Sequence, residues 1–289
     1  MSEGFLASLE PVPNVAWIML RSLIFIAGLF VATGCDSGSA MPTPIPDSGS
    51  TPRHAPVVIA SYPHDSTAFT QGLEWWGPYL VEGTGIEGKS NIRITSPQTG
   101  QVVAQYNLPP EIFGEGITVR DDTALQISWS SQELFAFDLS DDDISLQNHT
   151  INAYEGEGWG ICYDGDELAM SNGSDKIQFR RWDTFVPTRS IKVRLDGAPV
   201  DQLNELECAS GLIWANVWKT SIILAIDPET GVVRQVIDAK ELTPEGLENS
   251  ERAVLNGIAF NPETEHFWLT GKFWPVMYEV AFPDSPTPR

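Results

Sequence analysis

Five short segments of the chain share one pattern, and their first residues lie 44, 44, 45 and 52 positions apart (115−71, 159−115, 204−159 and 256−204). The segments are Gln71-Gly72-Leu73-Glu74-Trp75, Glu115-Gly116-Ile117-Thr118-Val119, Trp159-Gly160-Ile161-Cys162-Tyr163, Asn204-Glu205-Leu206-Glu207-Cys208 and Asn256-Gly257-Ile258-Ala259-Phe260. A period of about 40 to 50 residues made of short apolar runs is typical of propeller blades. Positions three and five are mostly apolar, as expected for strand residues that face a core. The repeat therefore predicts an all-β, five-bladed β-propeller.

Position one of the pattern can form hydrogen bonds in every repeat: it is Gln71, Glu115, Trp159, Asn204 and Asn256. Equivalent positions of the blades surround the central axis of a propeller, so we expect these five side chains to converge near it. A second apolar run follows each segment, and these runs cover residues 79–85, 125–129, 168–173, 213–218 and 267–272. If the two runs form a hairpin, Trp129, Trp218 and Lys272 end beside the position-one residues. The pattern thus also predicts a functional site.

The last repeat ends one strand short of a complete blade, because the chain runs out after the apolar run 277–280. The run 56–62 precedes the first repeat and has no hairpin partner of its own. We infer that this N-terminal strand joins the fifth blade and closes the ring. No segment with a helical period of useful length lies between Ala55 and Arg289, so the propeller domain is expected to cover residues 55–289.

The first 35 residues are predicted to form an export signal. An apolar stretch ends at Ala32-Thr33-Gly34-Cys35, which resembles the lipobox of bacterial lipoproteins, where the stretch is removed and the Cys carries the lipid. The alternative is an ordinary signal peptide or an uncleaved N-terminal anchor. A start at Met19 would give a normal basic start, so residues 1–18 are interpreted as a misassigned extension. The expected location is the bacterial cell envelope or periplasm, with membrane contact only through Cys35.

Residues 36–54 contain mainly Ser, Gly, Pro, Thr and Asp, and they are expected to form a flexible linker because they can bury little apolar surface. The net charge is −22, from 39 acidic and 17 basic residues, which argues against nucleic acid and anionic membrane surfaces as partners. We expect a monomer. Cys162 and Cys208 occupy positions four and five of their repeats, and alternate strand positions face opposite ways. Two buried free thiols are therefore favoured over a disulfide.

Motifs in every blade resemble the plant and bacterial glutaminyl-peptide cyclotransferase (glutamine cyclotransferase) family. They are Tyr62-Pro63-His64-Asp65, Ala68-Phe69-Thr70-Gln71-Gly72-Leu73, Phe113-Gly114-Glu115-Gly116-Ile117, Glu157-Gly158-Trp159-Gly160, Leu203-Asn204-Glu205-Leu206-Glu207, Ala215-Asn216-Val217-Trp218, Leu255-Asn256-Gly257-Ile258-Ala259 and Thr270-Gly271-Lys272-Phe273-Trp274-Pro275. The family forms a five-bladed propeller, in agreement with the repeat count. The resemblance implies conversion of the N-terminal Gln of a peptide or protein to pyroglutamate, with release of ammonia.

The resemblance also implies which residues form the site. It places catalytic positions at Glu115, Lys272 and Asn204, and substrate-binding positions at Phe69, Gln71, Phe113, Trp129, Trp159 and Trp218. The substrate's own α-amine attacks its γ-amide carbon, so the reaction needs near-attack geometry, a proton shuttle and a stabilised oxyanion rather than a nucleophile of the enzyme.

Glu115 is the candidate proton shuttle, with a pKa expected to rise among aromatic walls. The alternative for Glu115 is a structural carboxylate in a strand-end hydrogen-bond network. The three Trp residues are expected to hold the aliphatic part of the substrate Gln, and an indole N–H can donate a hydrogen bond to the oxygen of its amide. Core packing is the alternative for each of them. Lys272 either stabilises the oxyanion or positions a neighbouring carboxylate.

No metal site is predicted. The four His residues show no metal-ligand spacing, and neither Gly-x-Ser-x-Gly nor His-Glu-x-x-His occurs. We expect no required cofactor, and we leave open a structural Ca²⁺ near the axis, for which no ligand set is legible. The rival hypothesis is a surface-anchored propeller that binds peptide or sugar ends without turnover.

Overall fold

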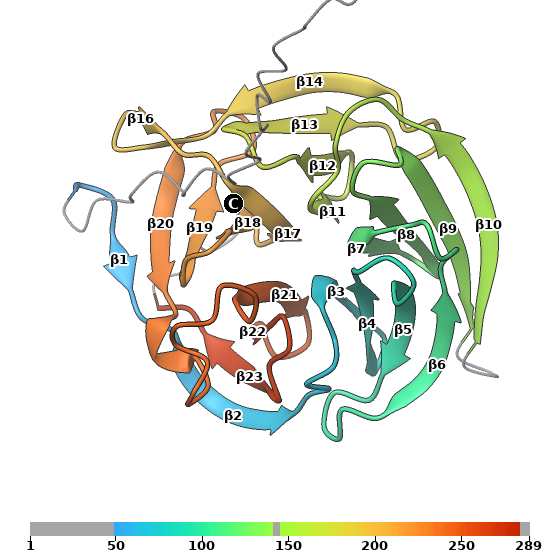
Figure 1. Cartoon of the computed structure of the whole chain (residues 1–289). Coiled ribbons are helices and arrows are strands. Elements are labelled where there is room, and N and C mark those ends of the chain that lie inside the picture. Colours follow the sequence, from blue (N-terminus) through green and yellow to red (C-terminus); the bar gives the residue numbers. More distant parts are fainter. Residues whose placement is uncertain (1–48, 141–144, 284–289) are drawn as a thin grey trace, which may run out of the picture. The chain divides into compact units, whose positions relative to one another are not determined.

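The structure is a computed structural model that describes residues 49–140 and 145–283. Cys35, the signal segment and the linker up to residue 48 lie outside the described residues, so their predictions stay predictions. The described chain forms four sheets of four strands and one sheet of five, arranged as blades around a central axis, together with a two-stranded ribbon (Figure 1). The all-β, five-bladed fold predicted from the repeat is confirmed.

A repeat segment forms the innermost strand of every blade, although in blade 3 the strand covers only its last three residues. From the axis outwards, blade 1 consists of β3 (Thr70–Trp76), β4 (Tyr79–Thr84), β5 (Asn91–Thr95) and β6 (Val102–Asn107). Blade 2 consists of β7 (Gly114–Arg120), β8 (Thr123–Ser128), β9 (Glu133–Ser140) and β10 (Ser145–Ala153). Blade 3 consists of β11 (Ile161–Tyr163), β12 (Leu168–Ser171), β13 (Lys176–Arg180) and β14 (Pro187–Lys192).

The last two blades take up strands from the N-terminal part of the domain. Blade 4 consists of β17 (Leu203–Ala209), β18 (Leu212–Val217), β19 (Ile222–Ile226) and β20 (Val233–Asp238), with β1 (Arg53–His54) at its outer edge. Blade 5 consists of β21 (Leu255–Asn261), β22 (His266–Gly271), β23 (Val276–Ala281) and β2 (Val57–Pro63). A two-stranded ribbon, β15 (Arg194–Leu195) with β16 (Ala198–Pro199), and the 3-10 helix η1 (Lys240–Leu242) complete the described elements.

The predicted ring closure is confirmed. Strand β2 pairs antiparallel with β23, from Val57 opposite Ala281 to Pro63 opposite Val276. Both ends of the domain therefore share blade 5, and β23 has no free edge at which another chain could add a strand.

The residues just before Ala55 do not behave as the predicted linker. Arg53 and His54 form β1, which pairs parallel with β20, and the Ser50 and Thr51 hydroxyls donate hydrogen bonds to Asp196 Oδ1 at 2.8 and 3.0 Å. The composition of this segment provides little apolar surface, but backbone pairing with the outer edge of a blade needs none. Order therefore begins before Ala55, where the sequence had placed the domain boundary.

Apolar side chains of neighbouring blades pack face to face. Positions three and five of a repeat face the preceding blade: Ile117 and Val119 pack against Ile92 of blade 1. Position four faces the following blade, as Cys162 does when it packs against blade 4. The core is thus divided into layers between blades.

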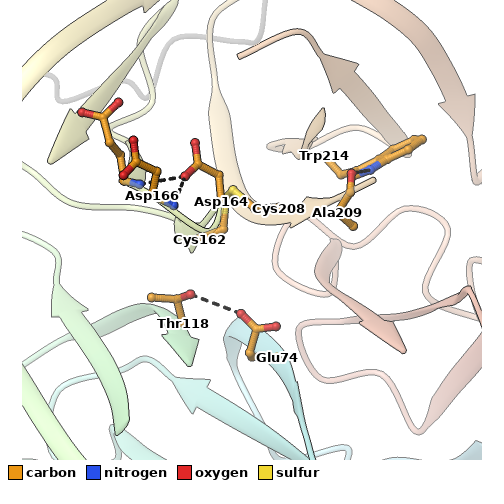
Figure 2. Close-up of a disulfide and its surroundings, with 9 residues drawn as sticks. Glu74, Thr118, Cys162, Asp164, Asp166, Cys208, Ala209 and Trp214 are labelled. Carbon is orange, nitrogen blue, oxygen red and sulfur yellow. Dashed lines mark hydrogen bonds between the residues drawn. A yellow bond between two sulfur atoms is a disulfide. The ribbon is translucent and has the colours of Figure 1, made fainter. Parts of the chain in front are cut away.

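The expectation of two free thiols was wrong, because Cys162 and Cys208 form a disulfide with their Cα atoms 5.4 Å apart (Figure 2). Alternate strand positions do face opposite ways, as the sequence analysis assumed. Between two neighbouring blades, however, this alternation brings the two cysteines together. Position four of blade 3 faces forwards and position five of blade 4 faces backwards, so the two side chains meet in the same layer. The disulfide links β11 to β17 close to the axis.

Glycine at position two lets the innermost strands approach one another. A Cβ atom on Gly116 would lie 2.8 Å from Gly160 Cα, and one on Gly160 would lie 2.1 Å from the Asn204 carbonyl oxygen. Blade 4 has Glu205 at this position instead. Its buried carboxylate accepts hydrogen bonds from the backbone N–H groups of Leu73 and Ile258 at 3.3 and 3.0 Å, and so connects blades 1, 4 and 5 at the axis.

Candidate active site

One cavity of about 280 Å³ contains every residue that the sequence assigned to the site. Its lining consists of Phe69, Gln71, Phe113, Glu115, Trp129, Trp159, Asn204, Trp218, Glu251, Arg252 and Lys272. The nine predicted residues come from all five blades and from segments up to 203 positions apart in the sequence (272−69). The ring therefore brings them together, as the repeat pattern predicted.

Strand irregularities direct the position-one side chains into this cavity. The pairing of the innermost strand with its neighbour shifts register between Thr70 and Gly72, between Gly114 and Ile117, and between Leu203 and Leu206. Such a bulge takes a residue out of the ladder and redirects its side chain. Gln71, Glu115 and Asn204 lie within these three shifts. Blade 5 has the same shift around Asn256, so the bulge takes each polar side chain out of the ladder, and the neighbouring groups decide whether it enters the cavity.

The fifth position-one residue does not reach the cavity. Asn256 is buried, and its Nδ2 atom donates a hydrogen bond to the Thr70 carbonyl at 3.0 Å, so that it ties β21 to β3. Blade 5 contributes Lys272 instead, which directly follows β22. Asn256 therefore lies between two innermost strands without lining the cavity, because its side chain pairs with a backbone carbonyl of the neighbouring blade.

Aromatic rings form most of the walls. Phe113 lies edge-on to Phe69 and to Trp129, with ring centroids 6.0 and 5.8 Å apart. Trp159 and Trp218 are perpendicular to each other with centroids 5.5 Å apart. Edge-to-face packing of this kind fixes the orientation of each ring against the next. The cavity therefore presents a pre-formed apolar slot with a few polar groups.

Glu157 belongs to the site and was not assigned from the sequence. Its Oε2 atom accepts hydrogen bonds from the indole N–H groups of Trp129 and Trp159 at 3.2 and 3.1 Å. A carboxylate therefore orients these two indoles, whereas the sequence suggested that an indole N–H could donate a hydrogen bond to the substrate amide. Glu157 stands within the Glu157-Gly158-Trp159-Gly160 motif, which was the available signal.

Glu251 and Arg252 at the mouth of the cavity were also missed. They lie in the loop between η1 and β21, and the Arg252 guanidinium carbon lies 6.0 Å from the Phe69 ring centre and 5.4 Å from that of Phe273. Loops between blades lack the periodic pattern of the strands, so repeat analysis has no means of finding them.

Glu115 is a buried carboxylate with one unused oxygen. Gln71 Nε2 donates a hydrogen bond to Glu115 Oε1 at 3.0 Å, while Oε2 has no hydrogen-bond partner. Burial raises the pKa of Glu115 well above its ordinary value; the positive charge of Lys272 opposes this rise and the negative charge of Glu157 adds to it. A carboxyl group whose pKa is raised in this way is better suited to accept a proton than an ordinary Glu side chain.

Lys272 is the buried cation of the cavity, whereas Arg252 at its mouth is exposed. The Nζ atom of Lys272 lies 4.6 Å from the centre of the Phe69 ring, and the side chain is buried. Burial lowers the pKa of Lys272 to about 8, against the opposing effect of Glu115. The ammonium group is thus desolvated and close enough to Glu115 to influence it, as a stabiliser of developing negative charge should be.

Further carboxylates are buried around the axis and do not line this cavity. Glu74 accepts a hydrogen bond from the Thr118 hydroxyl at 3.2 Å (Figure 2), and Glu205 and Glu207 are buried nearby. Burial raises the pKa of Glu74 to about 7 and those of Glu205 and Glu207 well above the ordinary value. Among the described residues, no group of three or more His, Cys, Asp or Glu side chains is arranged to hold a metal ion.

Within residues 49–140 and 145–283, no helix has the length and apolar character that crossing a membrane requires.

Comparison with known proteins gives a consistent result. The model of the glutamine cyclotransferase family matches residues 29–282. The chain is 34% identical over 227 residues to a glutaminyl-peptide cyclotransferase of Arabidopsis thaliana. The aligned residues cover 77% of this chain and 70% of that protein. The chain also superimposes on the crystal structure of Myxococcus xanthus glutaminyl cyclase with a TM-score of 0.73 and 37% identity, over 80% of this chain and 97% of the other. With the family match spanning all five blades, the chain belongs to the glutamine cyclotransferase family.

Proposed function

We propose that this protein is a glutaminyl-peptide cyclotransferase, an acyltransferase that converts the N-terminal Gln of peptides or proteins to pyroglutamate and releases ammonia. The observation that carries the proposal is the buried Glu115 carboxyl with its unused oxygen, inside a cavity of aromatic walls and amide side chains. Those walls suit the aliphatic part of a Gln side chain folded back on its own α-amine, which is the geometry that cyclisation needs.

Glu115 shuttles one proton. As the α-amine nitrogen forms a bond to the γ-amide carbon, Glu115 accepts a proton from that nitrogen. As the bond from this carbon to the amide nitrogen breaks, Glu115 returns the proton and ammonia leaves. The carboxyl ends in its starting state, and no proton is gained or lost overall. A pKa raised by burial suits a group that has to work in both directions.

Lys272 stabilises the oxyanion that forms on the γ-carbonyl between these steps. Its Nζ atom packs against the Phe69 ring, which keeps an N–H donor in a desolvated site where electrostatic stabilisation is strong. Asn204 and Gln71 supply the donors and acceptors that a primary amide needs. Glu157 keeps the rings of Trp129 and Trp159 in place.

The mechanism we propose uses no metal ion and no cofactor, because the carboxyl and ammonium groups supply the proton transfer and the charge stabilisation. The described side chains that line the cavity include no imidazole or thiolate, the usual transition-metal ligands. A structural Ca²⁺ would act on stability only.

We also propose that the enzyme is an exported bacterial lipoprotein anchored through Cys35, and that it works as a monomer, since one chain supplies all the residues that line the cavity. Radiolabelled palmitate incorporation that disappears in a Cys35→Ser variant would support the anchor; unchanged incorporation would contradict it. A single species with the mass of one chain in analytical ultracentrifugation at micromolar concentration would support the monomer; this mass is 31.8 kDa for all 289 residues and less for a mature chain that begins at Cys35.

The alternative is a propeller that binds peptide or sugar ends without turnover. It is less well supported, because a binding site has no need for a buried carboxyl next to a desolvated lysine. The deciding experiment is ammonia release from a Gln-initiated dipeptide by the purified protein, with and without prior treatment with a zinc chelator.

We expect ammonia release in both samples. Absence of release from Gln-initiated peptides, with peptide binding retained, would favour the binding module. Loss of release upon chelation, restored by added zinc, would contradict the metal-independent mechanism while leaving the cyclotransferase activity in place.

A further inference from the structure

A second cavity, of about 290 Å³, lies on the side of blade 3 that faces blade 2. Strand β13 contributes Lys176, Gln178 and Arg180, and the segment before blade 3 contributes two carboxylates, Glu155 and Glu157. Ser171 at the end of β12 and Ser190 on β14 complete the part of the lining that matters here. The cavity is polar, and the proposed reaction makes no use of it.

The base of this cavity holds a buried guanidinium with an unused donor. Arg180 is only 4% exposed; its two terminal nitrogens donate hydrogen bonds to the Phe185 carbonyl at 2.9 Å and to Gln178 Oε1 at 2.6 Å. Its Nε atom is buried and has no hydrogen-bond partner. The guanidinium carbon lies 5.6 and 4.8 Å from the ring centres of Tyr154 and Phe185. Only neutral groups therefore contact this cation in the described structure.

Blade 1 contains a buried arginine whose charge is paired with carboxylates. Arg93 is also buried and lines a cavity of its own, but it donates to Glu82 at 2.9 and 2.7 Å and to Asp65 at 2.8 Å. The chain has 39 acidic residues, yet among the described ones none forms an ion pair with Arg180. A buried charge without an ionic partner is costly, so an anion that entered this cavity would be attracted by Arg180 and Lys176, against the repulsion of the lining carboxylates Glu155 and Glu157.

This cavity shares a wall with the active site. Glu157 lines it, and the same carboxylate holds the indole N–H groups of Trp129 and Trp159 in the active site. The Trp159 backbone N–H also donates to the carbonyl of Ser171, another lining residue. Two indole donors on one oxygen partly offset the negative charge of Glu157. Glu157 therefore connects the lining of the second cavity to two walls of the active site.

We infer that the cavity on blade 3 is a carboxylate-binding subsite, in which Arg180 and Lys176 hold an acidic group of the peptide downstream of its N-terminal Gln. This inference rests on the proposed function for the identity of the peptide. The cavity would give the enzyme a preference for substrates with Asp, Glu or a free C-terminal carboxylate at one particular distance from Gln. Free small carboxylates are the other source of the same chemistry.

The test uses C-terminally amidated pentapeptides that start with Gln and carry a single Glu at position two, three, four or five, with Ala elsewhere. Each has a matched peptide with Gln in place of that Glu. Values of kcat/KM come from ammonia release, and peptide affinity is measured separately with the Glu115→Gln variant by calorimetry. The full protein is compared with Lys176→Gln, with Arg180→Lys, and with Lys192→Gln as control. Lys192 pairs with Lys176 across β13 and β14 but does not line the cavity.

We expect one Glu position to be preferred about tenfold over its matched Gln peptide, the contribution of one charge-assisted hydrogen bond. The preference should disappear in Lys176→Gln and Arg180→Lys, persist in Lys192→Gln, and appear in the affinities as well. Lys176 is on the surface, so Lys176→Gln should fold even if Arg180→Lys does not. A wild-type protein without any such preference, or a preference that survives Lys176→Gln, would overturn the inference.

Competition with glutarate, a free small dicarboxylate, shows whether the subsite serves the peptide substrate or free small carboxylates. If the subsite serves the peptide, glutarate should compete only with the preferred Glu peptide. Lys176-dependent glutarate binding without any peptide preference would overturn the assignment to the substrate. No ammonia release from any peptide would instead count against the proposed function, and the affinities would still report on the subsite.

Discussion

The side-chain amide of Gln71 donates a hydrogen bond to Glu115 across the boundary between blades 1 and 2, with Gln71 Nε2 3.0 Å from Glu115 Oε1. Both are position-one residues, and their repeats start 44 residues apart (115−71). This contact occupies one carboxylate oxygen and leaves the other, Oε2, without a partner. The arrangement holds Glu115 in one orientation while keeping one oxygen available for a proton.

Replacing Glu115 by Gln should abolish turnover and preserve binding. The variant keeps the size and hydrogen-bonding capacity of the side chain but cannot accept a proton, so kcat should fall by about 10²–10⁴-fold. Steady-state kinetics on a Gln-initiated peptide and calorimetric binding provide the two readouts. An exposed-turn variant, Glu229→Gln, controls for loss of one charge. A near-normal kcat would show that another group carries the proton.

Replacing Asn204 by Ala should impair both binding and rate. Asn204 lines the cavity with a primary amide that can pair with the substrate amide, and its loss leaves polar groups of a buried site unpaired. We expect kcat/KM to fall by about 10–100-fold, with KM rising as kcat falls. An increase in KM alone would restrict Asn204 to binding.

The half-buried carboxylate of Glu74 should make the fold less stable as the pH rises. Its pKa is raised by burial from 4.5 to about 7, so the folded state binds more protons than the unfolded state between these values. The free energy of unfolding should therefore decrease from pH 5 to pH 8. Urea denaturation at both pH values should show a smaller decrease in Glu74→Gln. An equal decrease in the two proteins would contradict this account.

Loss of the disulfide should destabilise the propeller. Cys162 and Cys208 are 46 residues apart in sequence, and closing a loop of this length contributes roughly 2–4 kcal/mol by restricting the unfolded chain. Denaturant unfolding of Cys162→Ala/Cys208→Ala should show a loss of this size. A reducing agent should lower the stability of the wild-type protein towards that of the variant, and it should leave the variant unchanged.

Removal of β2 should open the ring. A chain that starts at Ala55 lacks only β1 and should stay folded, whereas one that starts at Ser66 lacks β2 and exposes the edge of β23. An unpaired edge strand promotes aggregation. We expect the shorter chain to lose cooperative thermal unfolding and to form large species in light scattering. Similar melting of the two chains would mean that β2 is dispensable for closure.

Much of the site could be predicted from the sequence because a propeller is a repeated unit. Once the period and the position-one pattern are recognised, equivalent residues such as Gln71, Glu115 and Asn204 must lie at equivalent places around one axis. The resemblance to the glutamine cyclotransferase family supplied the residues that deviate from strict periodicity, such as Lys272. Both kinds of inference depend on strands, whose side chains alternate regularly.

Contacts between blades and from irregular loops were beyond the reach of the pattern. The Cys162–Cys208 disulfide required knowing that opposite faces of neighbouring blades meet, and the deviation of Asn256 depended on a backbone carbonyl from another blade. Glu251 and Arg252 come from a loop without a period, and the role of Glu157 follows from two indoles that happen to converge on it.

The sequence by itself determined the number of blades and the closing strand, because both follow from strand periodicity repeated five times, and its resemblance to the family pointed to nine of the residues that line the cavity. Only the tertiary structure decided which of the polar side chains are paired. Arg93 pairs with the carboxylates of Glu82 and Asp65, whereas Arg180 pairs with none among the described residues. The residues that surround a side chain in the folded ring set its pairing, and its position within its own repeat does not.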